Sequence, residues 1–142
     1  MNSSNQSLAF FLRLSKLHAI LASHFSKRLG GLGFNEFAIL LHLNEAPNQS
    51  LSYTDLGSLA GLSPADVTRQ LVPMEKIGLI SREANVENPR MSHASLAPGG
   101  AQKLTDAMDD IDPLMEELLP PMDAQVLQYA NSMLDEIADR AK

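Results

Sequence analysis

A chain of 142 residues, of which 44% are hydrophobic, is long enough to form one domain with its own core. It contains no cysteine, so disulfides, thiolate metal sites and thiol-based redox sensing are excluded. The formal net charge of −6 argues against a simple nucleic-acid-binding module, because such a domain is usually strongly basic. The charge is uneven, however: the first 35 residues are basic, and most acidic residues lie in the last third.

The sequence also bears on where the protein works. No apolar run approaches the roughly 20 residues that span a bilayer. The first residues, MNSSNQS, lack the basic start of a signal peptide, and the apolar residues that follow are interrupted by Arg13 and Lys16. We therefore expect a cytoplasmic protein that does not associate with a membrane.

The first predicted element is a long helix over residues 6–29. Its apolar residues, among them Leu8 and Leu12, are too many for one narrow stripe, so this helix must be covered on more than one side. A second subunit is the expected cover, which would make the protein a homodimer. A glycine-rich stretch ends the helix, and a second helix is predicted over residues 35–45.

Residues 52–77 predict two short helices joined by a tight turn. Ser52 and Ser63 each stand three residues before an aspartate, which is the pattern of a capped helix start, and Gly61 suits the corner between the helices. This arrangement is typical of a helix-turn-helix, whose second helix enters the major groove of DNA. Pro73 lies within that second helix, so we expect a kink or an early end there.

Two short strands are predicted next, over residues 79–84 and 92–96. The polar turn between them makes the pair a β-hairpin wing. Another helix begins at Pro98, and Pro113 predicts a kink or a restart within it. The last helix covers approximately residues 123–141.

The order helix, helix, helix-turn-helix, wing, helix, helix resembles the MarR family of bacterial transcriptional regulators. The resemblance rests on YTDLGSLAGLSPADVTRQLVPMEKIGLISRE (residues 53–83), on NPRMSHASLAPGG (residues 88–100) and on the flanking helices. It implies a homodimer that binds a pseudo-palindromic operator in double-stranded DNA.

The implied fold is mainly α, a winged helix-turn-helix with a two-stranded β-hairpin wing, flanked by N- and C-terminal dimerisation helices. Residues 1–142 would form a single domain. Within it we expect the winged helix-turn-helix over about residues 34–99 and the dimerisation helices over about residues 6–29 and 98–141.

Polar and small side chains on the second helix of the helix-turn-helix are expected to face DNA. Arg69 is suited to bind a guanine, Gln70 an adenine, and Thr68 a phosphate or a thymine methyl group. Arg90 is expected to enter the minor groove, where narrow A·T tracts attract arginine. A solvated helix face and an ordinary hairpin arginine are the alternatives. The predicted DNA-binding residues are Ser63, Ala65, Thr68, Arg69, Gln70, Arg90 and His93.

The resemblance further implies that a small anion, often phenolic, binds between the dimer helices and the DNA-binding lobe and releases the DNA. The residues on the first helix that fit such a ligand are Arg13, Lys16, His18 and His24. Each of them is alternatively a surface or interface side chain. The histidines show no His-x-x-x-His spacing, so no metal site is expected. No phosphate loop, dinucleotide fingerprint or nucleophile elbow is present, so neither a cofactor nor an enzymatic activity is expected.

A second hypothesis is a protein-interaction module, a winged helix that has lost its affinity for DNA. The wing reads Asn88-Pro89-Arg90 where the family usually carries an acidic residue followed by two arginines. The predicted winged helix-turn-helix (about residues 34–99), which we call the reader, is also close to neutral. A reader with few cations can hold phosphates only weakly. Binding to the DNA that flanks the protein's own gene would distinguish the two hypotheses.

Overall fold

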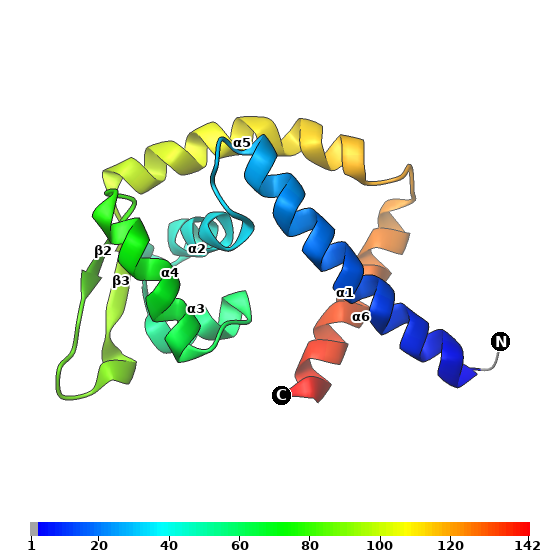
Figure 1. Cartoon of the computed structure of the whole chain (residues 1–142), viewed down its shortest axis with the longest axis horizontal. Helices are drawn as coiled ribbons and strands as arrows, with labels where there is room; N and C mark the ends of the chain where they lie inside the picture. Colours follow the sequence, from blue (N-terminus) through cyan, green and yellow to red (C-terminus); the bar gives the residue numbers. More distant parts are fainter. Residues whose placement is uncertain (1–2) are drawn as a thin grey trace. The chain divides into compact units, whose positions relative to one another are not determined.

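The computed structural model describes residues 3–142, which form six α-helices and three short strands (Figure 1). Two compact units divide the chain, one ending at Asp110 and one running from Ile111 to Lys142. Within the described range, none of the helices combines the length and the apolar character that a membrane span requires. In chain order the elements are α1 (Ser3–Arg28), α2 (Phe34–Glu45), η1 (Pro47–Gln49), β1 (Ser50–Ser52), α3 (Tyr53–Ala60), α4 (Pro64–Lys76), β2 (Ile80–Glu83), η2 (Pro89–Met91), β3 (His93–Leu96), α5 (Pro98–Leu118) and α6 (Ala124–Ala141).

Helix α2 lies at the centre of the core. Ile39, Leu40 and Leu43 on this helix are completely buried, and α2 contacts α1, α3 and α4. Its start is held by Glu36, whose carboxylate accepts a hydrogen bond from the Gly33 amide at 3.3 Å. The apolar residues of α2 therefore build the platform on which the next two helices pack.

The helix-turn-helix predicted from the sequence is present as α3 and α4. The Ser52 and Ser63 hydroxyls each accept a hydrogen bond from the amide three residues on, at 3.1 and 3.2 Å. Gly61 adopts a left-handed conformation with φ 68° at the end of α3, as the corner requires. Val67 and Leu71 of α4 are buried, so this helix turns its opposite face to solvent.

Of the alternatives expected at the two internal prolines, the structure excludes an early end at Pro73 and a restart at Pro113. Helix α4 continues past Pro73 to Lys76, and α5 continues through Pro113 to Leu118. Both proline rings lie on the exposed side of their helix, so each helix loses a backbone hydrogen bond without burying an unpaired group. The next residue in each case, Met74 or Leu114, is buried and holds the helix in place.

The sheet has one strand more than the two-stranded hairpin that the sequence predicts. Its antiparallel order is β1-β3-β2, with Leu51 and Arg82 both opposite Ala94. The Ser50 hydroxyl donates a hydrogen bond to the Ala94 carbonyl at 3.2 Å and accepts one from the Ser95 hydroxyl at 3.1 Å. Strand β1, which leads directly into α3, is thus hydrogen-bonded to β3 of the wing.

Two glycines bring the start of α5 against the turn between α4 and β2. A Cβ at Gly100 would lie 1.9 Å from the Leu79 carbonyl oxygen, and one at Gly99 would lie 2.6 Å from the Gly78 carbonyl oxygen. Any larger residue at Gly100 would collide with backbone, so this close approach depends on glycine. The start of α5 is consequently fixed to the winged helix.

Candidate nucleic-acid interface

The exposed face of α4 carries most of the residues that the sequence assigns to DNA. Ala65, Thr68 and Arg69 are exposed and lie at i, i+3 and i+4, which places them on one side of the helix. The Arg69 side chain is 75% exposed and pairs with Asp66 at 3.1 Å. The Thr68 hydroxyl donates to the Pro64 carbonyl at 3.3 Å, so its oxygen keeps only acceptor capacity while its methyl group is free for apolar contact.

Gln70 lies apart from this face. It is half-buried and lies next to residues of α1 and α2. It lines a hollow of about 240 Å³ together with His18, Ala22, Gly33, Phe34, Asn35 and Glu36. Gln70 therefore lies near α1, on a different face of α4 from the exposed Arg69.

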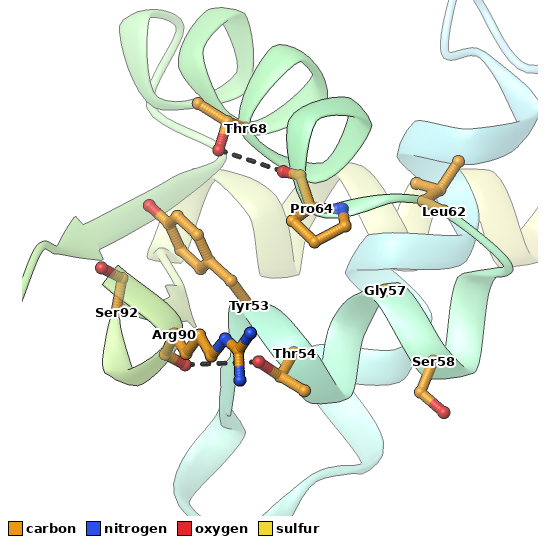
Figure 2. Close-up of a pocket in the computed structure, with 9 residues that line it drawn as sticks. All are labelled: Tyr53, Thr54, Gly57, Ser58, Leu62, Pro64, Thr68, Arg90 and Ser92. Carbon is orange, nitrogen blue, oxygen red and sulfur yellow. Dashed lines mark hydrogen bonds between the residues drawn. The ribbon is translucent and has the colours of Figure 1, made fainter. Parts of the chain in front are cut away.

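A larger hollow of about 510 Å³ lies between α3, the start of α4 and the wing (Figure 2). Its wall combines one cation, several hydroxyl groups and an apolar surface. It is lined by Tyr53, Thr54, Gly57, Ser58, Leu62, Pro64, Thr68, Arg90 and Ser92. Sequence reasoning did not identify Tyr53, Thr54 or Ser58, because only the fold brings α3 beside the wing.

The wing loop is held in shape by side chains that bind its own backbone. The Asn85 amide donates to the buried Ser92 hydroxyl at 3.1 Å, and the Asn85 side-chain oxygen accepts from the Glu87 and Asn88 amides at 3.1 and 3.0 Å. The Asn88 side-chain oxygen in turn accepts from the Arg90 amide at 3.3 Å. These Asx turns give the loop a defined conformation.

Arg90 and His93 are also anchored from neighbouring elements. The Thr54 hydroxyl on α3 donates to the Arg90 carbonyl at 3.4 Å, a contact drawn in Figure 2. A ring nitrogen of His93 contacts the Met91 carbonyl, and the side chain is half-buried. Arg90 itself is exposed, so its guanidinium group is available to a ligand.

Arg82 serves as a brace between α4 and β2. Its amide and guanidinium groups donate to the Glu75 carboxylate at 3.0–3.2 Å. The hydrogen-bonded Glu75 carboxylate, and to a smaller extent the nearby Tyr53 hydroxyl, raise the pKa of Arg82 above its usual value. Because Glu75 neutralises its charge, Arg82 adds little to the attraction for phosphate.

The four residues proposed for an effector are distributed along α1. Arg13 and Lys16 are exposed, and His24 is half-buried with its Nε2 atom lacking a hydrogen-bond partner in the described chain. Of the four, His18 lines the 240 Å³ hollow, where its ring meets Phe34 edge-on at 6.4 Å between centroids. His18 therefore lines the same hollow as Glu36 and Gln70.

Comparison with known proteins agrees with this geometry. The model of the MarR family matches residues 32–91. The fold is similar to AbsC, a MarR family transcriptional regulator from Streptomyces coelicolor (22% identity, TM-score 0.79, covering 99% of this chain and 96% of that chain).

Two other similar structures were solved with bound ligands. Sco3205, a MarR family transcriptional regulator from Streptomyces coelicolor in complex with DNA, is 18% identical (TM-score 0.80, covering 98% of this chain and 89% of that chain). CouR from Rhodococcus jostii RHA1, bound to p-coumaroyl-CoA, is also 18% identical (TM-score 0.78, covering 97% and 96%). At these identities the likeness establishes the fold. No curated protein sequence matches the chain.

Proposed function

The chain carries a MarR-family domain over residues 32–91, and on that premise we propose that it is a sequence-specific DNA-binding regulator of transcription. It acts as a homodimer on a pseudo-palindromic operator and responds to a small-molecule effector. The observation that carries the proposal is the exposed face of α4, where Ala65, Thr68 and Arg69 stand clear of the core beside the wing. A helix presented in this way fits the major groove.

The terminal helices support the homodimer. Leu12 on α1 is 63% exposed and Tyr129 on α6 is 71% exposed, and Leu8 and Val126 on the same two helices are also exposed. On each helix taken by itself, several exposed apolar groups mark an interaction surface. A two-fold dimer through α1 and α6 would cover them and present two copies of α4 to DNA.

The 240 Å³ hollow is the proposed effector site. Its side chains are His18, Asn35, Glu36 and Gln70, with the ring of Phe34 as an apolar wall. Because the Glu36 carboxylate accepts hydrogen bonds and repels a bare anion, a phenol that donates its hydroxyl proton fits better than a carboxylate. Gln70 belongs to α4, so a ligand in this hollow would act directly on the recognition helix.

Operator geometry provides the decisive experiment. The protein is titrated against the DNA that flanks its own gene, with random DNA as the reference, and the protected half-sites are mapped. Inserting about five base pairs between the half-sites turns one of them off the bound face, and affinity should fall. Inserting about ten restores the face and should recover part of the binding. Equal affinity for all three spacings would contradict the dimeric reader.

The wing gives the protein-interaction alternative one specific observation in its favour. Its outer surface combines Glu83 and Glu87 with Val86, whose side chain is 92% exposed. Acidic groups there disfavour contact with phosphates. If the protein binds flanking DNA no better than random DNA, the interaction module becomes the better proposal.

A further inference from the structure

We propose that the 510 Å³ hollow between α3, α4 and the wing binds one phosphodiester group of the bound DNA, and that Arg90 is the cation that contacts this group. This inference rests on the proposed function, because its ligand is DNA. The sequence favours insertion of Arg90 into the minor groove. The surroundings of Arg90 in the fold favour the sugar–phosphate backbone instead.

The charges around the hollow suit a phosphate. None of the nine residues that line it is acidic, although the chain as a whole has a net charge of −6. Of the arginines near the reader, Arg69 is paired with Asp66 and Arg82 with Glu75. Among these three arginines, Arg90 is the one without an ion pair to a residue in the described part of the chain, so no carboxylate competes with an anion for its guanidinium group.

The hollow is also lined by hydroxyl groups, of which that of Ser58 is exposed. Tyr53 lines the hollow, and its buried hydroxyl lies on the side away from Arg90, near Arg82. A phosphodiester accepts hydrogen bonds through its oxygens and donates none, so it complements the Ser58 hydroxyl.

The remaining wall fits the sugar that accompanies a phosphate. Figure 2 shows the Tyr53 ring and Pro64 on the side of the hollow nearest α4, with Arg90 and Thr54 together on the opposite side. Leu62 adds a further apolar group. Deoxyribose carbons can pack on these surfaces while the phosphate faces Arg90.

The anchoring of Arg90 explains why it does not extend into a groove. Its carbonyl is held by Thr54 and its amide by Asn88, so its backbone is tied to α3. Thr54 is thus a positioning residue for Arg90. The far part of the wing is formed by residues 85–87 instead, where Glu87 would be repelled by the negative potential of a narrow minor groove.

A phosphate-neutralisation scan tests the assignment. Duplexes selected by the wild-type protein from a randomised pool are prepared with single neutral methylphosphonates, and binding is measured for wild type, R90A, R90K and K76A. One neutralised phosphate in each half-site should weaken wild type several-fold and leave R90A unaffected. K76A removes an exposed cation outside the hollow, so neutralising the phosphate assigned to Arg90 should weaken K76A as much as it weakens wild type.

Salt titration of the same variants provides a second readout. In R90A, the slope of log K against log salt should become shallower by about 0.9 for each half-site, since one phosphate contact is lost. R90K should retain most of the slope, because lysine also holds phosphate as a point charge. S58A should weaken binding without changing the slope, because it removes an exposed hydroxyl donor and no charge.

The outcomes separate this inference from the proposed function. If wild type binds selected DNA, R90A loses preference for A·T pairs at the half-site edges and its methylphosphonate scan matches wild type, then Arg90 is a minor-groove reader and only the inference is wrong. If wild type fails to enrich any duplex above random DNA, the proposed function and the inference are both wrong. A normal thermal transition of R90A and R90K verifies that they fold.

Discussion

The winged-helix part and the terminal helix α6 bury their apolar side chains to very different extents. In the winged-helix part, Leu56 on α3 and Leu71 on α4 are fully enclosed. In α6 none of the 18 residues is buried, although its Val126 and Met133 are apolar. A segment that fills its own core is stable within one chain, whereas an exposed apolar helix face calls for another surface. The contrast supports the proposal that the winged-helix part folds around its own core while the exposed apolar face of α6 takes part in assembly.

The largest effect on stability should come from creating a cavity in the core of the reader. Leu71→Ala removes a fully buried side chain and should lower the free energy of unfolding by about 2–5 kcal/mol. Urea denaturation measures the loss. The matched control is Leu134→Ala on α6, where the side chain is 40% exposed; its effect should grow with protein concentration, because it acts through assembly. If both variants lost the same free energy of unfolding at every protein concentration, the proposed difference between the two regions would be wrong.

A charge on the first helix should break assembly while leaving the reader folded. Leu12→Glu places a carboxylate where the proposed dimer seam is apolar, and an unpaired buried charge is strongly disfavoured. Light scattering should report a monomer, and circular dichroism should report unchanged helix content. Ser23→Glu, at an exposed polar position of the same helix, should remain dimeric. A monomeric wild type at micromolar concentration would remove the basis for the proposed homodimer.

A smaller effect is expected within the reader. Arg69→Ala should cost about 1–3 kcal/mol of operator binding and relax base preference at one position in each half-site. Stability should hardly change, because the exposed pair with Asp66 contributes little. Binding to specific and to random duplexes is compared by anisotropy. A parallel fall on both would identify Arg69 as a phosphate contact.

The smallest expected effect is the dependence of DNA affinity on salt concentration. The cations available near DNA are Arg69, Lys76 and Arg90 in each subunit, with Lys27 and Arg28 as possible contributors. Each neutralised phosphate contributes about −0.9 to the slope of log K against log salt, so the wild-type slope should stay modest. A slope steeper than about −8 would show that more cations reach DNA than this reader offers.

The sequence predicts the elements of the fold best where the signal is local. The caps at Ser52 and Ser63 and the glycine corner lie within a few residues of the groups they bind, and they form as expected. Strand β1 was missed because a Ser-Leu-Ser segment has little strand character of its own. It becomes a strand by pairing with β3, whose residues lie beyond both helices of the reader.

The candidate site divides in the same way. Helical spacing suffices to put Thr68 and Arg69 on one exposed face. The surroundings of Gln70 and Arg90 depend on residues distant in the sequence, since Gln70 faces a hollow with His18 and Arg90 is held by Thr54 across a separation of 36 residues. No local pattern carries that information, so these placements required the structure.

The strand that precedes α3 has a consequence for how the reader opens. The hydroxyl bond from Ser95 to Ser50 joins residues 45 positions apart, and the paired strands β1 and β3 enclose α3, α4 and β2 between them in the sequence. Closing this loop costs conformational entropy, and contacts among the enclosed helices help to offset that cost. The amides of β1 and β3 should therefore exchange with solvent together with those of α4, as one cooperative unfolding unit. Substitutions that weaken the β1–β3 pairing should therefore also speed amide exchange in α4.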